Sequence, residues 1–116
     1  KKDKTFIEKC IKNHAYILRF LDPKIKFDYL FLEKLIKING YCLQYIPDVF
    51  KDEFNFALLA VKQNGLSINF VEGELRKNKE IIIEAIKQNR ESYDFIDNSM
   101  KLDKDVNAAF MKYSAI

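Results

Sequence analysis

A period of 25 residues runs through the chain and constrains its fold more than any other feature. The segment AVKQNG at positions 60–65 returns as AIKQNR at 85–90 and, in the other direction, as LIKING at 35–40. The same step reaches CIKNHA at 10–15 and FMKYSA at 110–115 without any insertion. Periods of about 20 to 50 residues are typical of solenoids, in which neighbouring copies stack to share one core. We therefore expect a single domain of stacked copies.

The period divides residues 1–116 into four whole units and one partial unit. The units are residues 3–27, 28–52, 53–77, 78–102 and 103–116. Each opens on a residue that can cap a helix, in order Asp3, Asp28, Glu53, Asn78 and Asp103. Because the last unit stops after its first helix, we expect the chain to be part of a longer protein.

The first half of each unit predicts a helix, and the central copy is the most apolar. Between Glu53 and Lys62 only Asn55 is polar, so we expect this helix to be covered on nearly all sides. Gly65, after the last helical turn, predicts a firm helix end with the glycine in the left-handed conformation.

The second half of each unit leaves two interpretations open. Leu66, Ile68 and Phe70 alternate as a strand would, and leucine-rich repeats place a strand in a unit of similar length. Ile68 and Val71, however, lie three residues apart, as one helical face requires, and the other copies repeat this spacing. We favour a short helix or 3-10 turn, and hence an all-α fold: a short α-solenoid of stacked 25-residue helix pairs, with helices of about ten and six residues.

Composition narrows the classes of partner. The net charge is only +3, and just three of the 20 basic residues are arginine. Because phosphate recognition favours the planar fork of arginine, nucleic acid is a disfavoured partner. The chain has no apolar run approaching the roughly 18 residues of a membrane span, so no transmembrane segment is predicted.

The two cysteines predict free thiols. Cys10 and Cys42 have neither a CxxC partner nor a metal-ligand spacing, and buried free cysteine often behaves as a small hydrophobic residue. This pattern favours a reducing compartment, either the cytoplasm or, for an effector, the host cytosol. No cofactor or metal is predicted, and no catalytic residue is proposed, since His14 is the only histidine.

Two sets of residues are candidate partner-binding sites. The first is a column of lysines one repeat apart: Lys12, Lys37, Lys62, Lys87 and Lys112. Such a column could meet an acidic partner, although lysines in the last turn of a helix also stabilise the negative end of its dipole. The second set is the pair Tyr16 and Tyr41, which we expect to be exposed. A column of His14, Asn39, Asn64, Asn89 and Ser114 could bind a peptide, but we favour its role in capping helix ends and joining neighbouring repeats.

The motifs AVKQNG and LQYIPDVFKDE, at the 25-residue step, resemble the repeats of the domain of unknown function 4116 family. Residues 28–89 match best, whereas His14 and Ala15 stand where Asn and Gly are expected, and Arg90 replaces a Gly. The resemblance implies a helical scaffold module of the kind found in large bacterial and protist proteins, some of them effectors of intracellular bacteria. It supplies no catalytic residue.

These observations predict a non-enzymatic helical-repeat scaffold or protein-interaction module whose partner is an unidentified protein or peptide. The alternative is electrostatic binding of an anionic partner, either nucleic acid or a membrane surface, through the lysine column. An enzymatic activity is expected only if a catalytic domain lies elsewhere in a longer protein.

Overall fold

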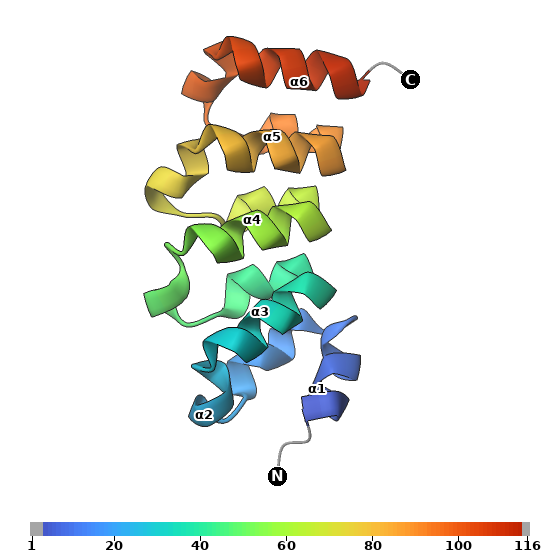
Figure 1. Ribbon diagram of the computed structural model, residues 1–116, viewed down its shortest axis with the longest axis vertical. Helices are drawn as coiled ribbons and strands as arrows, with labels where there is room; N and C mark the ends of the chain where they lie inside the picture. Colours follow the sequence, from blue (N-terminus) through green and yellow to red (C-terminus); the bar gives the residue numbers. More distant parts are fainter. Residues whose placement is uncertain (1–3, 115–116) are drawn as a thin grey trace.

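The computed structural model describes residues 4–114 as an all-helical stack 50 Å long (Figure 1). Asp3, the expected first cap, lies outside the described residues. In chain order the elements are α1 (Lys4–Ile11), η1 (Ala15–Phe20), α2 (Pro23–Lys26), α3 (Tyr29–Ile38), η2 (Gly40–Tyr45), η3 (Asp48–Phe50), α4 (Phe54–Gln63), η4 (Gly65–Phe70), η5 (Gly73–Lys77), α5 (Lys79–Gln88), η6 (Arg90–Phe95), η7 (Asn98–Leu102) and α6 (Lys104–Ser114), where η denotes a 3-10 helix. The all-α solenoid is thus confirmed, and no strand occurs in residues 4–114.

The opening residue of most units caps its helix as expected. Asp28 accepts the amide of Phe31 at 3.1 Å, and Asn78 accepts the amide of Ile81 at the same distance. Glu53 is the exception, because its side chain makes no cap bond and instead accepts the hydroxyl of Tyr29 at 3.4 Å. The long helices α3, α4 and α5 each have ten residues, and the 3-10 helices that follow them each have six.

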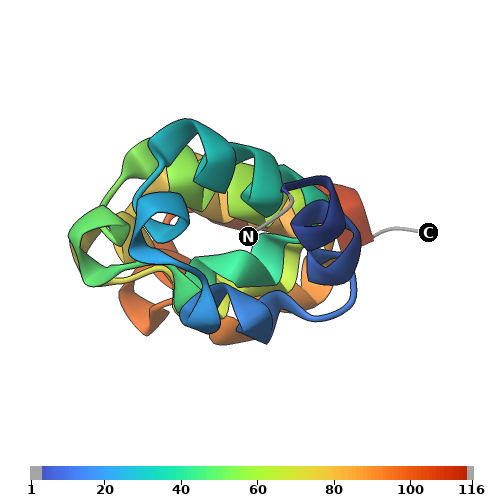
Figure 2. The same cartoon turned by 90° about the horizontal axis from the view of Figure 1, so that it is seen from below.

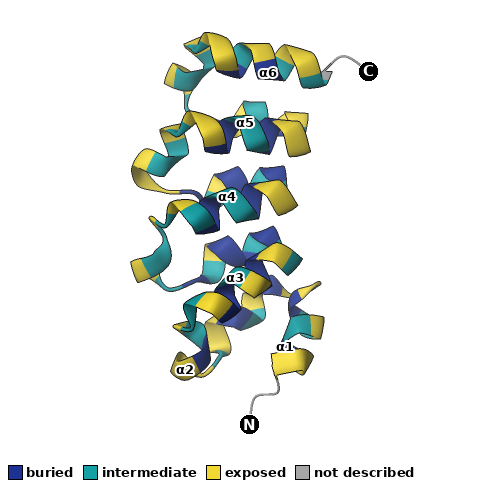
Figure 3. Cartoon of the chain, viewed as in Figure 1, coloured by how far each residue is buried: buried dark blue, intermediate teal, exposed yellow. Residues whose placement is uncertain are grey.

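The long helices and the six-residue 3-10 helices form two rows that face each other across the core. Figure 1 shows α3 to α6 stacked along the longest axis, and Figure 2 looks along that axis. The buried side chains point between the rows, as the dark blue inner faces in Figure 3 show. Phe31, Phe56, Ile81 and Val106, one repeat apart, are all buried in this core. The expected enclosure of α4 holds except at Phe54, which is 38% exposed.

The structure corrects the expected role of Gly65 and of its counterpart Gly40. Neither has a positive φ, and Gly73 (φ 63°) is the one residue of the described chain that does. Gly40 and Gly65 instead begin 3-10 helices that press against the long helix of the next unit. A Cβ on Gly40 would lie 2.5 Å from the carbonyl oxygen of Ala60, and one on Gly65 would be as close to that of Ala85. These glycines are therefore needed for close packing between repeats.

A third short helix in each unit was not predicted. The segment expected to be a linker forms α2, η3, η5 and η7 in successive units. These helices turn one apolar residue per unit toward the core: Ile25, Phe50, Leu75 and Met100. The ring of Phe50 meets that of Phe56 edge-on, with centroids 5.7 Å apart. The repeat is thus a helix with two short helices, and it closes the end of the core that a helix pair would leave open.

Candidate functional site

All five lysines of the predicted column are exposed. Lys37, Lys62, Lys87 and Lys112 lie in the last turn of their helices, whereas Lys12 comes one residue after α1 ends. Lys87 pairs with Glu84 at 3.6 Å, and the ammonium group of Lys112 lies 5.4 Å from the ring of Tyr113. Among the described residues no ion pair involves Lys12, Lys37 or Lys62, so these three charges face solvent.

Tyr16 and Tyr41 lie together in a groove of about 370 Å³ on the 3-10 row. The groove spans three successive repeats. Its aromatic and apolar lining includes Tyr16, Tyr41, Tyr45, Leu66 and Phe70. Its amide lining is Asn13, Asn39, Gln44 and Asn69. The two predicted tyrosines are therefore neighbours in one surface feature, and we call this feature the tyrosine groove.

The aromatic rings of the tyrosine groove are held against one another. Tyr41 meets Phe70 of the next repeat edge-on, with centroids 5.8 Å apart. Tyr16 meets His14 in the same geometry at 5.7 Å. Tyr16 is 47% exposed as expected, whereas Tyr41 is half-buried because it packs on Phe70. These rings offer a mostly rigid apolar surface with hydroxyl groups that can bind a ligand.

The asparagine column builds the groove. The Asn39 side-chain amide donates to the carbonyls of Ile11 at 2.9 Å and Lys12 at 3.3 Å, both in the previous repeat. Its Oδ1 accepts the amide of Tyr41 at 3.0 Å. Asn39 thus caps one helix, starts the next and joins two repeats, as predicted. Asn64 and Asn89 cap the following 3-10 helices in the same way, through the amides of Leu66 and Glu91.

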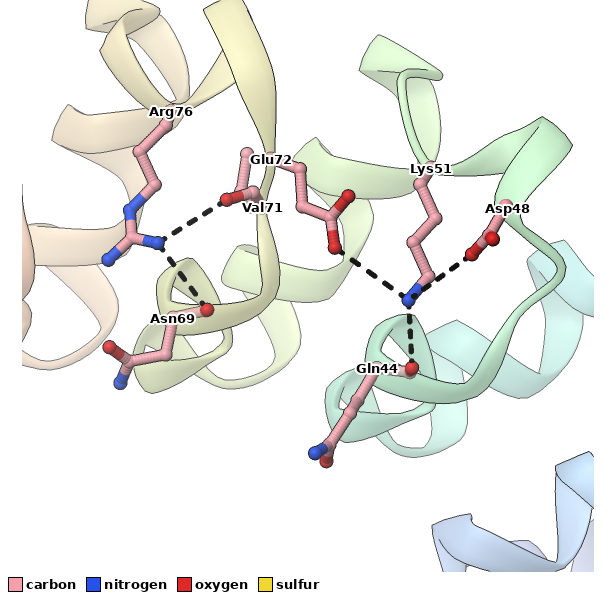
Figure 4. A network of polar contacts seen from close by, with 7 residues as sticks. All are labelled: Gln44, Asp48, Lys51, Asn69, Val71, Glu72 and Arg76. Atoms are coloured by element: carbon pink, nitrogen blue, oxygen red, sulfur yellow. Dashed lines mark hydrogen bonds and ion pairs between the residues drawn. The ribbon is translucent and has the colours of Figure 1, made fainter.

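A second column, which the sequence analysis noted without assigning a role, braces the 3-10 row from behind (Figure 4). Lys26 and Lys51 donate to the carbonyls of Arg19 and Gln44, seven residues earlier, at 3.2 and 3.1 Å. Arg76 reaches the carbonyls of Asn69, at 3.5 Å, and of Phe95 in the next repeat, at 2.9 Å. These cations hold backbone oxygens at the ends of the 3-10 helices, so their role is structural. A constant spacing of seven residues back to a helix end was the available signal.

Figure 4 shows the Gln44 side chain pointing away from Lys51. That amide is exposed and makes no hydrogen bond with the described residues. Asn69, its counterpart one repeat on, is also exposed, and its Nδ2 makes only a local 3.3 Å bond to the carbonyl of Leu66. The tyrosine groove therefore presents amide groups that can bond to a partner's backbone.

Several predicted acidic residues meet elsewhere. Glu72 and Glu74 share a hollow of about 680 Å³ with Asp48 and Asp52, between the third helices of two repeats. Lys51 offsets part of this charge, because its ammonium lies 3.8 Å from Glu72 and 4.0 Å from Asp48. Within residues 4–114 no group of three or more His, Cys, Asp or Glu side chains is placed to hold a metal ion. We regard this hollow as a solvated face.

Cys42 lies buried in η2, beneath the groove. Burial raises the pKa of its thiol to about 12, so the side chain stays protonated at neutral pH. A protonated thiol is a poor nucleophile and a poor metal ligand. Cys42 and Cys10 are both free, in agreement with the sequence analysis.

Comparison with known proteins gave one family. The family model of the domain of unknown function DUF4116 matches this chain twice, at residues 28–76 and 54–101. The two matches overlap and are offset by about one repeat, as tandem copies require. No curated protein and no solved structure matched the chain. None of the helices in the described part of the chain is both long and apolar enough to cross a membrane.

Proposed function

Because this chain belongs to the DUF4116 family, whose description assigns no activity, we propose a function from the surface itself: a non-enzymatic scaffold that binds an extended segment of a partner protein in the tyrosine groove. One observation carries the proposal. The groove brings aromatic rings and amide side chains from three successive repeats into one continuous feature.

The shape of the groove favours a peptide over a small molecule. Its volume of about 370 Å³ is at the low end for ligand pockets, which enclose most of their ligand. Here the lining residues are spread over three repeats in place of a single deep cavity. An extended chain can follow such a row, placing side chains against the rings of Tyr16 and Tyr41 and its backbone against Gln44. Tyrosine is well suited to this role because it offers large contact area with few rotatable bonds.

Selection from a random 12-residue peptide display library tests the proposal. Peptides enriched on the wild-type protein would be synthesised, and their affinity measured by isothermal titration calorimetry. We expect the double variant Tyr16→Ser, Tyr41→Ser to weaken binding at least about ten-fold, since two hot-spot rings are removed. The control is Phe6→Ser, which removes a 63% exposed ring on α1, outside the groove. Equal affinity of the tyrosine variant and the wild type would contradict the proposal.

The second candidate function is electrostatic binding of an anionic surface through the lysine column. The observation in its favour is that Lys12, Lys37 and Lys62 are exposed and lack ion pairs within the described chain. A pull-down from a lysate at low and high salt, with the variant Lys37→Glu, Lys62→Glu, Lys87→Glu as comparison, distinguishes it. Recovery of nucleic acid or lipid that disappears with salt and with charge reversal would favour this function. Binding of the selected peptides that survives both changes would favour the groove.

A further inference from the structure

The charge of the 3-10 row changes in one direction along the stack. The helix η1 contains Arg19 and no acid, so its net charge is +1. The helices η2 and η4 contain no charged residue. In η6 the acids Glu91 and Asp94 outweigh Arg90, which gives a net charge of −1. The row is thus positive at the first repeat, neutral in the middle and negative at the fourth.

One column of the repeat shows this gradient clearly. Its members are Arg19, Gln44, Asn69 and Asp94, each 25 residues from the next and all exposed. The two middle members line the tyrosine groove. The guanidinium of Arg19 lies 5.4 Å from the ring of Tyr45, another lining residue, which places this charge at the first-repeat end of the groove.

The charges at the two ends are not neutralised within the described chain. None of its ion pairs involves Arg19, Glu91 or Asp94. The third charge of η6, Arg90, lies 5.2 Å from the ring of Phe110 in α6, toward the next unit and away from the groove. A ligand that spans the row therefore meets a free cation at one end and two free carboxylates at the other.

We propose that the tyrosine groove binds an extended peptide with one charge polarity: the peptide's acidic residues lie against Arg19, and its basic residues lie against Glu91 and Asp94. This inference rests on the proposed function and adds the chemistry of the partner. Neighbouring helices pack about 8 to 10 Å apart, so the three steps from η1 to η6 cover roughly 24 to 30 Å. An extended chain rises about 3.3 Å per residue, so about eight or nine residues separate the two charged ends.

The size of the effect follows from exposure. Exposed ion pairs contribute little each, and a Debye length of about 8 Å at physiological salt makes the two ends act almost independently. We therefore expect a peptide with both charged ends to bind about five-fold more tightly than its uncharged counterpart. The preference should decline as salt is added, whereas the contribution of the rings should remain.

Three synthetic 12-residue peptides test the polarity. All share a central segment of alternating tyrosine and serine. The first carries two aspartates at its N-terminus and two lysines at its C-terminus, the second exchanges them, and the third has serine at both ends. Each is made with a nitroxide-labelled residue beside one end, the aspartate end in the charged peptides. Affinity is measured by fluorescence anisotropy, and the position of the label by broadening of backbone amide NMR signals.

In both charged peptides we expect the label to broaden the signals of η1 and leave those of η6 sharp, because the charge pattern and not the chain direction sets the orientation. The variant Arg19→Glu, Glu91→Arg, Asp94→Arg should move the broadening to η6. Circular dichroism and thermal melting show whether that variant keeps its fold.

The possible outcomes separate the two proposals. Broadening at both ends alike, or unchanged broadening in the variant, would overturn the polarity inference while peptide binding at Tyr16 and Tyr41 still supported the groove. Equal affinity of all three peptides would overturn it as well. If none of the three peptides binds the wild-type protein, both the polarity and the groove proposal fail.

Discussion

The backbone amide of Gly40 donates a hydrogen bond to the side-chain Oε1 of Gln63, 2.6 Å away and in the next repeat. Gly65 and Gln88 form the same pair one repeat later. Each pair closes the junction between the 3-10 helix of one unit and the long helix of the next. Gly40 makes this approach possible because it has no Cβ, and Gln63 satisfies an amide that the approach removes from water. The stack is therefore held by polar bonds between repeats as well as by its apolar core.

The change Gly40→Ala should destabilise the protein by about 2 to 3 kcal/mol, because overpacking forces the backbone at Ala60 to shift. Urea unfolding followed by circular dichroism measures the free energy of unfolding. The control is Gly73→Asn, at a position with φ 63° and open space around it. Asparagine tolerates this conformation, so the control should cost under about 1 kcal/mol. Equal costs would contradict the close-packing role of Gly40.

The change Gln63→Ala should cost about 1 to 3 kcal/mol, because it leaves the buried amide of Gly40 without its acceptor. Hydrogen exchange gives a local measurement, and we expect the Gly40 amide to exchange faster in the variant. Gln44→Ala is the matched control, since the Gln44 side chain is exposed and makes no bond within the described chain. Its effect should stay within about 0.5 kcal/mol.

The change Phe56→Ala should cost about 3 to 5 kcal/mol, the range for removing a fully buried aromatic ring. Thermal melting and urea unfolding both measure it. The same column supplies the control, because Phe6 occupies the equivalent position in the first unit but is 63% exposed. Phe6→Ala should therefore cost under about 1 kcal/mol. A similar cost at both positions would mean that burial does not set the contribution of this column.

The sequence predicted the fold well because burial in a solenoid repeats with the chain. The columns of Phe56 and of Lys62 keep one environment through most of the stack, so a period of 25 residues was enough to assign them. The third helix was missed because attention to charge hid the apolar column of Ile25 and Phe50 inside the linker. That column was readable at the same period.

Contacts between units were harder to predict. Gly65 after a helix is compatible with a left-handed cap, and only the position of Ala85 in the next unit shows that close packing is the reason. The tyrosine groove has the same origin. Tyr16 and Tyr41 share a column, but their neighbours Gln44 and Phe70 come from other columns, which meet only once the stacking geometry is known.

Acid should weaken the stack at its helix caps. Backbone hydrogen bonds from the capped helix lower the pKa of Asp28 and of Asp103, and Lys4 and Lys79 add to this effect. A carboxylate with a lowered pKa contributes stability that is present above its unfolded pKa of about 3.9 and is lost as the pH falls through its folded pKa. The variant Asp28→Asn, Asp103→Asn keeps a capping side chain but cannot titrate. Its stability should decline less than that of the wild type from pH 5 to pH 2, measured by urea unfolding across this range.

The buried thiol of Cys42 predicts the response to base. Because burial raises its pKa to about 12, the folded state keeps the proton that the unfolded state releases above its own pKa of about 8.5. Stability should therefore fall as the pH rises above about 8.5, and Cys42→Ala should remove part of this dependence. Iodoacetamide at pH 8 gives a second measurement, since Cys42 should be alkylated only after unfolding in guanidinium. Alkylation of Cys42 in the folded protein, detected by mass spectrometry of its peptides, would show that the core beneath the tyrosine groove opens more readily than its packing implies.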